Sequence, residues 1–313
     1  MITRDQETFL ALARGFAPDF GPATARAAFL VTPEGFDRAE ESAQDNRYMA
    51  AAGCYHCDEA LAEHRALQRA LAADLPVFAF PGDPATPDAV FPNNVFATAR
   101  PDAAVHPAAP SRLIVGRMRH AVRQREAERA DIRTFFRQVS GTDEIDLSQQ
   151  PHPCELTGSL VIDRARGLGY CGLSERCDEA GARLAHEAFG LRATLVFDLA
   201  PGEYHANVVL AVLAGRAALV APAGFADPAV AHAIAGFYAP HAVLLRPEQQ
   251  AAFAGNAIAL APGRVWMSQA GAASLDPAQA QVLASAGFEL GQVPLAAIEA
   301  GGGSLRCCVA EVF

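Results

Sequence analysis

Short apolar runs recur along this chain at a nearly constant interval, and each run follows a polar residue. Four such runs lie at residues 159–163, 208–213, 257–261 and 309–313. The polar residues ahead of them are separated by 50, 51 and 51 positions: Glu155, His205, Asn256 and Cys307. An interval of this size is typical of repeated supersecondary units, which place equivalent positions in the same part of a fold. We therefore expect these four side chains to meet.

The first three runs each begin a module with the predicted order strand, tight turn, strand, helix, strand. The predicted helices cover residues 178–189, 227–237 and 276–286, and each begins at an aspartate, a preferred N-cap residue. Glycines in the turns fit tight hairpins between the first two strands of each module. The pattern predicts an α/β fold built from repeated units.

A fourth module precedes these three. Its predicted strands lie at residues 95–99 and 113–116, and its predicted helix covers residues 123–139. Asn94 stands directly ahead of the first of these strands, where the other modules carry Glu155, His205 and Asn256. Asn94 therefore joins the set of polar residues that we expect to meet.

A fifth module is divided between the two ends of the sequence. The run at residues 309–313 has no partner after it, and the run at residues 28–31, followed by a predicted helix at 58–73, has none before it. Pairing the two runs would close five modules into a ring and remove exposed sheet edges. We therefore expect a single domain over residues 1–313, a pseudo-symmetric five-bladed α/β propeller of strand–strand–helix–strand repeats.

Composition narrows the class of protein. The chain has 313 residues, 51% of them hydrophobic, and a formal net charge of −10, which argues against a nucleic-acid partner. The basic stretch at residues 117–129 also contains Glu126 and Glu128 and is interpreted as a solvated helix face. No apolar run approaches the roughly 18 residues that span a membrane. Seven cysteines and no signal-peptide pattern favour a reducing cytoplasm.

The four residues in register supply a thiol, an imidazole, a carboxylate and an amide. A cysteine thiolate is a strong nucleophile, and a histidine beside it carries protons to and from the reacting groups. The set Cys307, His205 and Glu155 is therefore a candidate for covalent catalysis.

Five motifs occur in a fixed order along the chain: FPNNVF at 91–96, ELTGSLVIDR at 155–164, YHANV at 204–208, FAGN at 253–256 and GGGSLRC at 301–307. In this order they resemble the arginine deiminase and amidinotransferase superfamily, also called penteins, and most of all its citrulline-utilising hydrolase branch. The resemblance covers about residues 29–313. It implies a five-bladed α/β propeller, the shape that the repeats indicate independently.

The resemblance implies a role for each catalytic candidate. Cys307 would attack the central carbon of a guanidino or ureido group and expel an amine, leaving a covalent intermediate that water hydrolyses. His205 would protonate the departing amine and then deprotonate the water, and Glu155 would orient the imidazole or bind a substrate N–H. Relatives have glycine where this chain has Leu156, and a leucine there is expected in an ordinary backbone conformation.

Several asparagines indicate which substrate the site would bind. Asn94 and Asn207 stand where arginine deiminases carry aspartates, and a neutral amide suits a neutral ureido group better than a cationic guanidinium. Citrulline is therefore the favoured substrate, or arginine converted through citrulline in sequential steps. Asn93, adjacent to Asn94, is a further substrate-binding candidate, and Asn46 would recognise the amino-acid end of the substrate. Asn256 would line the axis or cap a strand.

The leading interpretation is a hydrolase that converts citrulline or arginine to an ornithine-type product and releases ammonia. The alternatives are an amidinotransferase, a deiminase or dihydrolase acting on a substituted arginine, and a non-catalytic binding propeller. No cofactor is expected. No metal is expected either, because the Cys54–Cys57 pair lacks a second pair of ligands. The expected partner is a small guanidino or ureido amino acid, and a homo-oligomer remains open.

Overall fold

The strands in the described part of the chain form five separate sheets. The computed structural model describes residues 1–50, 55–102, 105 and 109–313. In every sheet one strand pairs antiparallel with a second, and the second pairs in parallel with a third. This is the pairing that a strand, a hairpin and a helical crossover produce. The order strand, turn, strand, helix, strand that was predicted for the modules beginning at residues 159, 208 and 257 is therefore confirmed.

Each sheet contains a unit of three strands, in which the first pairs antiparallel with the second and the second pairs in parallel with the third. In that order the units are β4 (Phe96–Ala99), β5 (Arg112–Val115) and β6 (Asp143–Asp146); β7 (Leu160–Asp163), β8 (Leu168–Leu173) and β9 (Ala193–Asp198); β10 (Leu210–Leu213), β11 (Ala217–Val220) and β12 (Ala242–Leu244); β13 (Ile258–Ala261), β14 (Arg264–Ser268) and β15 (Glu289–Val293); and β16 (Ala310–Val312), β2 (Ala27–Val31) and β3 (Val77–Phe80). We call β4, β7, β10, β13 and β16 the inner strands. Inner strands of neighbouring sheets contact one another, β7 with β10, β10 with β13 and β16 with β4.

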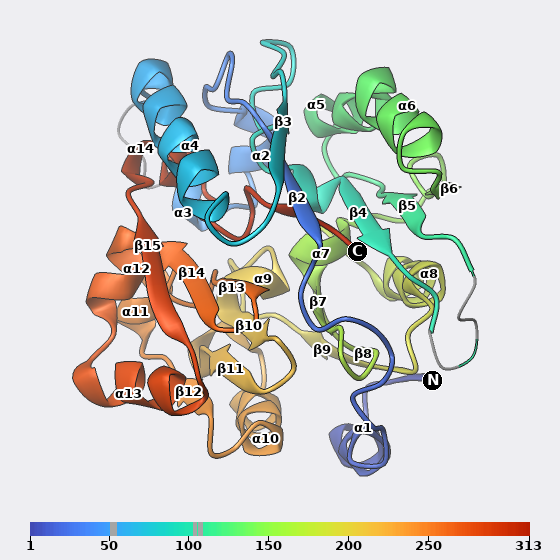
Figure 1. The fold of residues 1–313 in the computed structure, drawn as a ribbon, viewed down its shortest axis with the longest axis vertical. Coiled ribbons are helices and arrows are strands. Elements are labelled where there is room, and N and C mark those ends of the chain that lie inside the picture. Colours follow the sequence, from blue (N-terminus) through green and yellow to red (C-terminus); the bar gives the residue numbers. More distant parts are fainter. Residues whose placement is uncertain (51–54, 103–104, 106–108) are drawn as a thin grey trace.

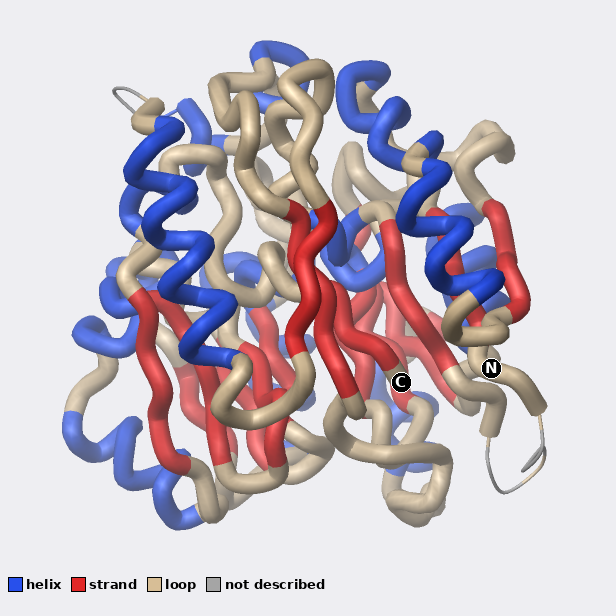
Figure 2. Tube along the Cα trace, turned by 45° about the horizontal axis from the view of Figure 1, so that its top comes forward, coloured by secondary structure: helices blue, strands red, loops and turns tan. Residues whose placement is uncertain are grey.

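The longer helices lie outside the sheets, as Figures 1 and 2 show. They are α1 (Gln6–Ala13), α4 (Cys57–Leu71), α6 (Ala130–Gln138), α8 (Glu179–Phe189), α10 (Pro228–Phe237) and α13 (Pro277–Ser285). Single turns and short helices complete the chain: α2 (Glu40–Ala43), α3 (Arg47–Ala50), η1 (Pro92–Asn94), α5 (Ala121–Gln124), η2 (Arg125–Glu128), α7 (Leu156–Ser159), α9 (Ala206–Val209), η3 (Pro222–Gly224), α11 (Pro247–Ala251), α12 (Gln269–Ser274) and α14 (Ala296–Glu299).

Local sequence explains where the helices begin. Asp178 accepts a hydrogen bond from the backbone N–H of Gly181 at the start of α8, and Asp276 forms a reciprocal capping box with Gln279 at the start of α13. Helix α8 ends at Gly190, whose φ of 64° is in the left-handed region that glycine adopts readily. The apolar faces of the helices and sheets then pack together into the buried core.

The predicted division of one module between the two ends of the sequence is confirmed. Strand β16 pairs antiparallel with β2, with Ala310 opposite Phe29 and Val312 opposite Ala27. Strand β2 then pairs in parallel with β3. Val312 and Phe313 are both buried, so the last residues are part of the core.

Some predicted boundaries are wrong. Val208 and Val209 belong to the helical turn α9 and not to a strand, and Ser159 likewise belongs to α7. The helix predicted at residues 123–139 is divided into α5, η2 and α6, because the backbone at Arg129 is extended, with ψ at 91°. The short strand β1 (Ile2–Thr3), which pairs with the edge strand β9, and the strand β6 were not predicted.

Deleting residues 310–313 should unfold the protein. The deletion removes the inner strand of one sheet and the buried side chains of Val312 and Phe313, each worth about 1.5–3 kcal/mol. The measurement is thermal unfolding followed by circular dichroism. Deleting residues 1–3 is the control, since β1 only extends the outer edge of a sheet. A cooperative transition near the wild-type midpoint in the first variant would contradict the prediction.

Candidate active site

One polar residue stands ahead of the inner strand in each of the five sheets. Asn94 closes η1 before β4, Glu155 precedes α7 and β7, and His205 precedes α9 and β10. Asn256 and Cys307 precede β13 and β16. Because the inner strands pack side by side, these residues lie at the same end of the five strands.

Hydrogen bonds join these positions across sheet boundaries. Asn256 Nδ2 donates to Cys307 Sγ at 3.3 Å and to the carbonyl of Asn207 at 2.8 Å. Asn207 Nδ2 in turn donates to the carbonyl of Thr157 at 3.1 Å. The partners are about 50 residues apart in sequence, so the repeat interval corresponds to direct contact in space.

A small cavity opens at this end of the strands, with about 260 Å³ of empty space. Its walls come from the segment at 40–50, from η1 and the residues before it, and from the glycine-rich run before β16. The lining residues are Ser42, Asn46, Met49, Asp88, Phe91, Asn94, Arg123, Arg176, Tyr204, Gly301, Gly303 and Cys307.

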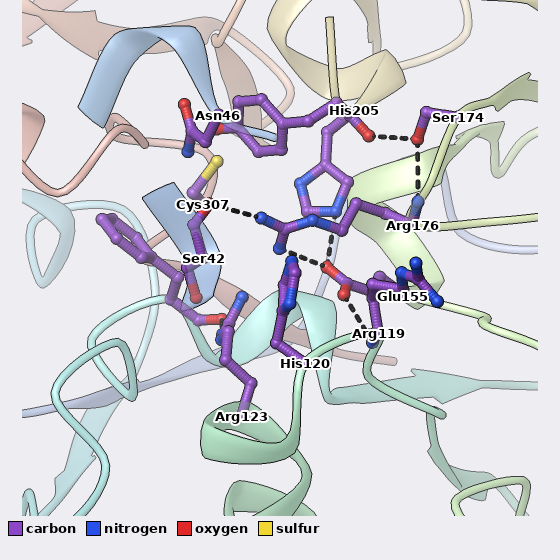
Figure 3. A network of polar contacts seen from close by, with 12 residues as sticks. Ser42, Asn46, Arg119, His120, Arg123, Glu155, Ser174, Arg176, His205 and Cys307 are labelled. Carbon is purple, nitrogen blue, oxygen red and sulfur yellow. Dashed lines mark hydrogen bonds and ion pairs between the residues drawn. The ribbon is translucent and has the colours of Figure 1, made fainter. Parts of the chain in front are cut away.

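Glu155 and His205 form a fully buried pair. His205 Nε2 lies 2.8 Å from Glu155 Oε2, and Arg176 Nη1 lies 3.3 Å from the same oxygen (Figure 3). Burial alone would raise the pKa of Glu155, but the Arg176 guanidinium and the His205 ring hold that pKa well below its usual range. Glu155 is therefore a carboxylate, and His205 must carry its proton on Nε2 to donate to it.

Within the described part of the chain, the other ring nitrogen of His205 has no hydrogen-bond partner. Burial lowers the pKa of His205 despite the opposing effect of Glu155, so the imidazole is neutral and its Nδ1 is a bare acceptor. Asn94 Oδ1 and Asp88 Oδ1 are also buried acceptors without a partner. Nδ1 of His205 and Oδ1 of Asn94 both lie within 3 Å of the point where a Cβ on Gly158 would stand. Only glycine fits there, and the two acceptors share one small space.

Cys307 is buried beside amides. Its sulfur accepts from Asn256 Nδ2 and lies 3.7 Å from Asn207 Oδ1. Burial raises the pKa of the Cys307 thiol, and the Asn256 hydrogen bond and the charge of Arg306 reduce that rise. A Cβ on Gly303 would lie 2.9 Å from the ring of Phe91 and 3.2 Å from Cys307 Cβ, so the glycine run lets the backbone approach the thiol closely.

The segment at residues 40–50 covers the cavity. Asn46 Nδ2 donates to the carbonyl of Gly302 at 3.3 Å. Asp45 accepts from Arg176 Nε at 3.0 Å and lies 2.9 Å from His120 Nε2. Figure 3 shows Asn46 and Ser42 on one side of the cavity and the Arg176–Glu155–His205 group on the other. Arg176 therefore joins the covering segment to the buried carboxylate.

The asparagines that were predicted to bind substrate lie in different places relative to the cavity. Asn46 and Asn94 line the cavity. Asn93 is buried behind it, where its Nδ2 donates to Thr157 Oγ1 at 3.3 Å. Asn207 and Asn256 lie beneath the thiol and hold it through the hydrogen bonds described above.

Two arginines that line the cavity, Arg123 and Arg176, were among the residues missed in the sequence. The interpretation of residues 117–129 as a solvated helix face is wrong at its centre, because Arg123 and Glu126 are each only 3% exposed and form an ion pair at 2.8 Å. Arg123 and Glu126 are three residues apart, a spacing that brings side chains together on a helix. This spacing was the sequence signal that could have predicted their ion pair. Arg176 carried no comparable signal, since its partners Asp45 and Glu155 are distant in sequence.

The backbone conformation of Leu156 differs from the one expected from the sequence. Its φ is 30°, a backbone conformation that leucine rarely adopts, although an ordinary one was expected. The strained residue follows Glu155 directly, and such strain persists only where the surrounding structure enforces it. The fold therefore imposes the glycine-like backbone at this point in spite of the leucine.

The described part of the chain holds no cluster of three or more histidine, cysteine or acidic side chains suited to a metal ion. Cys54 of the CxxC pair lies outside the described residues. Among the described helices, none is long and apolar enough to cross a bilayer.

Comparison with known proteins identifies the relatives of this fold. The N-terminal domain of ArgZ, an arginine dihydrolase in Cyanobacteria, solved with bound product, superposes with a TM-score of 0.76 at 18% identity over 92% of this chain and 97% of that one. Unliganded AgrE gives 0.76 at 20% identity over 92% and 39%. A dimethylarginine dimethylaminohydrolase adduct with S-methyl-L-thiocitrulline gives 0.66 at 20% identity over 92% and 99%.

Comparison with the curated proteins finds no match. A family model, described as N,N dimethylarginine dimethylhydrolase, eukaryotic, matches residues 32–313. On that match the chain belongs to the N,N dimethylarginine dimethylhydrolase family, within the guanidino-modifying pentein superfamily.

Proposed function

We propose that this protein hydrolyses a C–N bond of the guanidino group of arginine or a substituted arginine, through a covalent bond to Cys307. In this proposal residues 1–313 act as one domain, and the five sheets are the blades of a propeller with the cavity at one end of its axis. The observation that carries the proposal is a set of buried acceptors without a partner among the described residues: Asn94 Oδ1 and Asp88 Oδ1, whose residues line the cavity, and His205 Nδ1, which lies with Asn94 Oδ1 beside Gly158.

These acceptors favour a ligand rich in N–H donors. A buried acceptor without a partner is destabilising by about 1–3 kcal/mol, and a ligand N–H would remove that penalty. A guanidinium carries five N–H groups around one carbon, whereas a ureido group carries three and adds an oxygen that needs a donor. The cavity therefore favours the guanidino form over citrulline as the entering substrate. The names of ArgZ and of the dimethylarginine hydrolase point to the same class of compound.

The polar groups around the cavity suggest how an amino-acid substrate is oriented. Asp88 Oδ2 accepts from Ser42 Oγ at 2.6 Å, which leaves Oδ1 for an ammonium group. Asn46, from the covering segment, supplies an amide at the same cavity. The α-amino end would lie near Asp88 and Asn46, and the guanidino end near Asn94 and His205.

The proposed reaction uses His205 twice. Nδ1 of His205 takes the proton of the Cys307 thiol, and the sulfur attacks the guanidino carbon. The imidazolium then returns the proton to the departing amine or ammonia. In the second half, Nδ1 accepts a proton from water as the water oxygen attacks the same carbon. The C–S bond then breaks, the sulfur leaves as a thiolate, and Nδ1 returns the proton to it. Glu155 keeps the proton on Nε2 throughout, so Nδ1 is the nitrogen that acts.

A ureido product remains a substrate in principle, because it still carries an amide-type C–N bond at the same carbon. A second attack by Cys307 would release another ammonia and leave a thiocarbamate on the sulfur. Water would hydrolyse it to a carbamate and free thiol, and the carbamate would lose CO2 to leave an ornithine-type amine. Asn94 accommodates both the guanidino and the ureido group, since its neutral amide both donates and accepts. Transfer of the amidino group to an amine in place of water would also use Cys307 and His205. The two similar structures whose names state an activity, ArgZ and the dimethylarginine dimethylaminohydrolase, are both hydrolases.

Replacing Cys307 by serine should abolish turnover. The test measures ammonia release over arginine, mono- and dimethylated arginine and citrulline, with at least about a 10³-fold loss expected because the nucleophile is removed. Cys308→Ser is the matched control, because Cys308 is equally buried, packs in the apolar core and donates a hydrogen bond from its thiol to the carbonyl of Ser304. Turnover that survives in the first variant, or wild-type protein inert toward all four compounds, would refute the proposal.

Asn94→Asp should shift selectivity toward cationic substrates. A carboxylate at this position would form a charge-assisted hydrogen bond with a guanidinium and would offer nothing to a ureido oxygen. The ratio of kcat/KM for arginine to that for citrulline is expected to rise about tenfold. An unchanged ratio in a folded variant would show that Asn94 does not contact the reacting group.

Alkylation of Cys307 should depend steeply on pH in the absence of substrate. Because burial raises its pKa above the usual value of about 8.5, the thiolate fraction at neutral pH is small and grows tenfold with each pH unit. The rate of iodoacetamide labelling at Cys307, followed by peptide mass analysis, should therefore still be rising at pH 9. A labelling rate that levels off below pH 7 would indicate a preformed thiolate–imidazolium pair instead.

A further inference from the structure

The sulfur of Cys307 contacts two buried side-chain amides. Asn256 Nδ2 lies 3.3 Å from Sγ, and Asn207 Oδ1 lies 3.7 Å from it. The two asparagines are 0% and 2% exposed, so bulk water does not compete for these contacts. The sulfur is therefore in contact with the nitrogen of one amide and with the oxygen of the other.

The backbone fixes the orientation of the Asn256 amide. Its Oδ1 accepts the backbone N–H of Arg306 at 3.0 Å and that of Cys307 at 3.4 Å. Because a backbone N–H can only donate, the amide oxygen must face these two groups, and Nδ2 is left to face the sulfur. Nδ2 also donates to the carbonyl of Asn207 at 2.8 Å. Asn256 therefore presents a donor to the sulfur and cannot turn away from it without losing its other hydrogen bonds.

The Asn207 amide is fixed in the opposite sense. Its Nδ2 donates to the carbonyl of Thr157 at 3.1 Å, and a carbonyl can only accept, so Oδ1 is the atom that faces the sulfur. The S–H of a neutral thiol can donate to this oxygen. A thiolate has no proton to donate and would instead meet the partial negative charge of the oxygen.

We propose that Asn256 and Asn207 are positioning residues with opposite effects on Cys307: Asn256 stabilises the thiolate, and Asn207 stabilises the thiol. A hydrogen bond to an ionised group is roughly twice as strong as one between neutral groups, so the Asn256 contact strengthens when the sulfur loses its proton. The Asn207 contact is lost at the same moment. The hydrogen bond from Asn256 also opposes the rise that burial causes in the pKa of Cys307.

The two amides regulate the same sulfur at two steps, and this consequence rests on the proposed function. The sulfur becomes a thiolate when His205 takes its proton, and again when the C–S bond of the intermediate breaks. Asn256 supplies its donor at both steps. Before substrate enters, Asn207 favours the neutral thiol, which avoids a buried charge on the sulfur while the cavity is empty.

Other charged and titratable groups surround the thiol, and they are the same in the wild-type protein and in variants of the two amides. They are the cavity residues Asp88, Arg123, Arg176 and Tyr204, the chain neighbours Arg306 and Cys308, and the proposed base His205. The charges of Arg306 and Arg123 also favour the thiolate. Because the two substitutions have opposite expected effects, comparing them separates the amides from this common background.

The test is the pH dependence of iodoacetamide labelling at Cys307 without substrate, followed by peptide mass analysis. Asn256→Asp keeps an oxygen for the two backbone N–H groups but replaces the donor that faces the sulfur by a second oxygen. Labelling should be about tenfold slower at pH 8, with the profile displaced to higher pH. Asn207→Leu keeps the branched side-chain shape and removes the oxygen. Labelling should be about threefold faster, with the profile displaced to lower pH.

The half-buried thiol of Cys57 on α4 is the internal control, because it contacts the carbonyl of Pro33, and its labelling should not change. A change in access to the cavity would scale the labelling rate of Cys307 equally at every pH, whereas a change in ionisation moves the profile along the pH axis. Profiles that do not move, or that move in the same direction in both variants, would overturn the proposal. Where one variant fails to fold, the direction of the shift in the other decides alone.

The consequence for turnover is measured separately. The kcat for arginine should fall about tenfold in Asn256→Asp. KM should change little, because neither Asn256 nor Asn207 lines the cavity that holds Cys307. Wild-type protein that is inert toward guanidino compounds would refute the proposed function and leave the labelling result standing. Unmoved labelling profiles in an active enzyme would refute the amide proposal alone.

Discussion

The arrangement of the site depends on one buried carboxylate. Glu155 has no exposure to solvent, and its charge is sustained by Arg176 and by the Nε2–H of His205, with Oε1 accepting the backbone N–H of Arg119 at 2.9 Å. Because the carboxylate is ionised, His205 must place its proton on Nε2, which leaves Nδ1 as an acceptor. The chemistry assigned to His205 follows from this pair.

Arg176 extends the same interaction to the rest of the cavity. Its Nη1 donates a hydrogen bond to Glu155, whereas its Nε and Nη2 donate to Asp45 and to the carbonyl of Ser42 in the covering segment. The closure of the cavity and the orientation of the imidazole are thus coupled through one side chain. Breaking a buried pair of this kind leaves an uncompensated charge, a much larger perturbation than the loss of a surface ion pair.

The repeated architecture solves a positioning problem. The proposed nucleophile, the proposed base and their supports come from parts of the chain about 50 residues apart. Contacts of β7 with β10, of β10 with β13 and of β16 with β4 bring the ends of neighbouring inner strands together, so that residues of different sheets form hydrogen bonds there. Asn256 and Asn207 then join neighbouring sheets beneath the thiol. The amide positions that the sequence suggested for substrate contact therefore include two that support Cys307.

The interval between Glu155, His205, Asn256 and Cys307, together with the Asp-capped helices, was sufficient to predict the modules, the pairing of the two ends of the chain, and the contacts of Glu155 with His205 and of Asn256 with Cys307. Each module folds from consecutive residues, and the repeat of the same local pattern places equivalent positions beside one another. The buried state of Arg123 and Arg176, the backbone of Leu156 and the unpartnered acceptors depend on partners far away in sequence. Only the tertiary structure decided them, because burial and charge pairing arise when distant segments exclude water together.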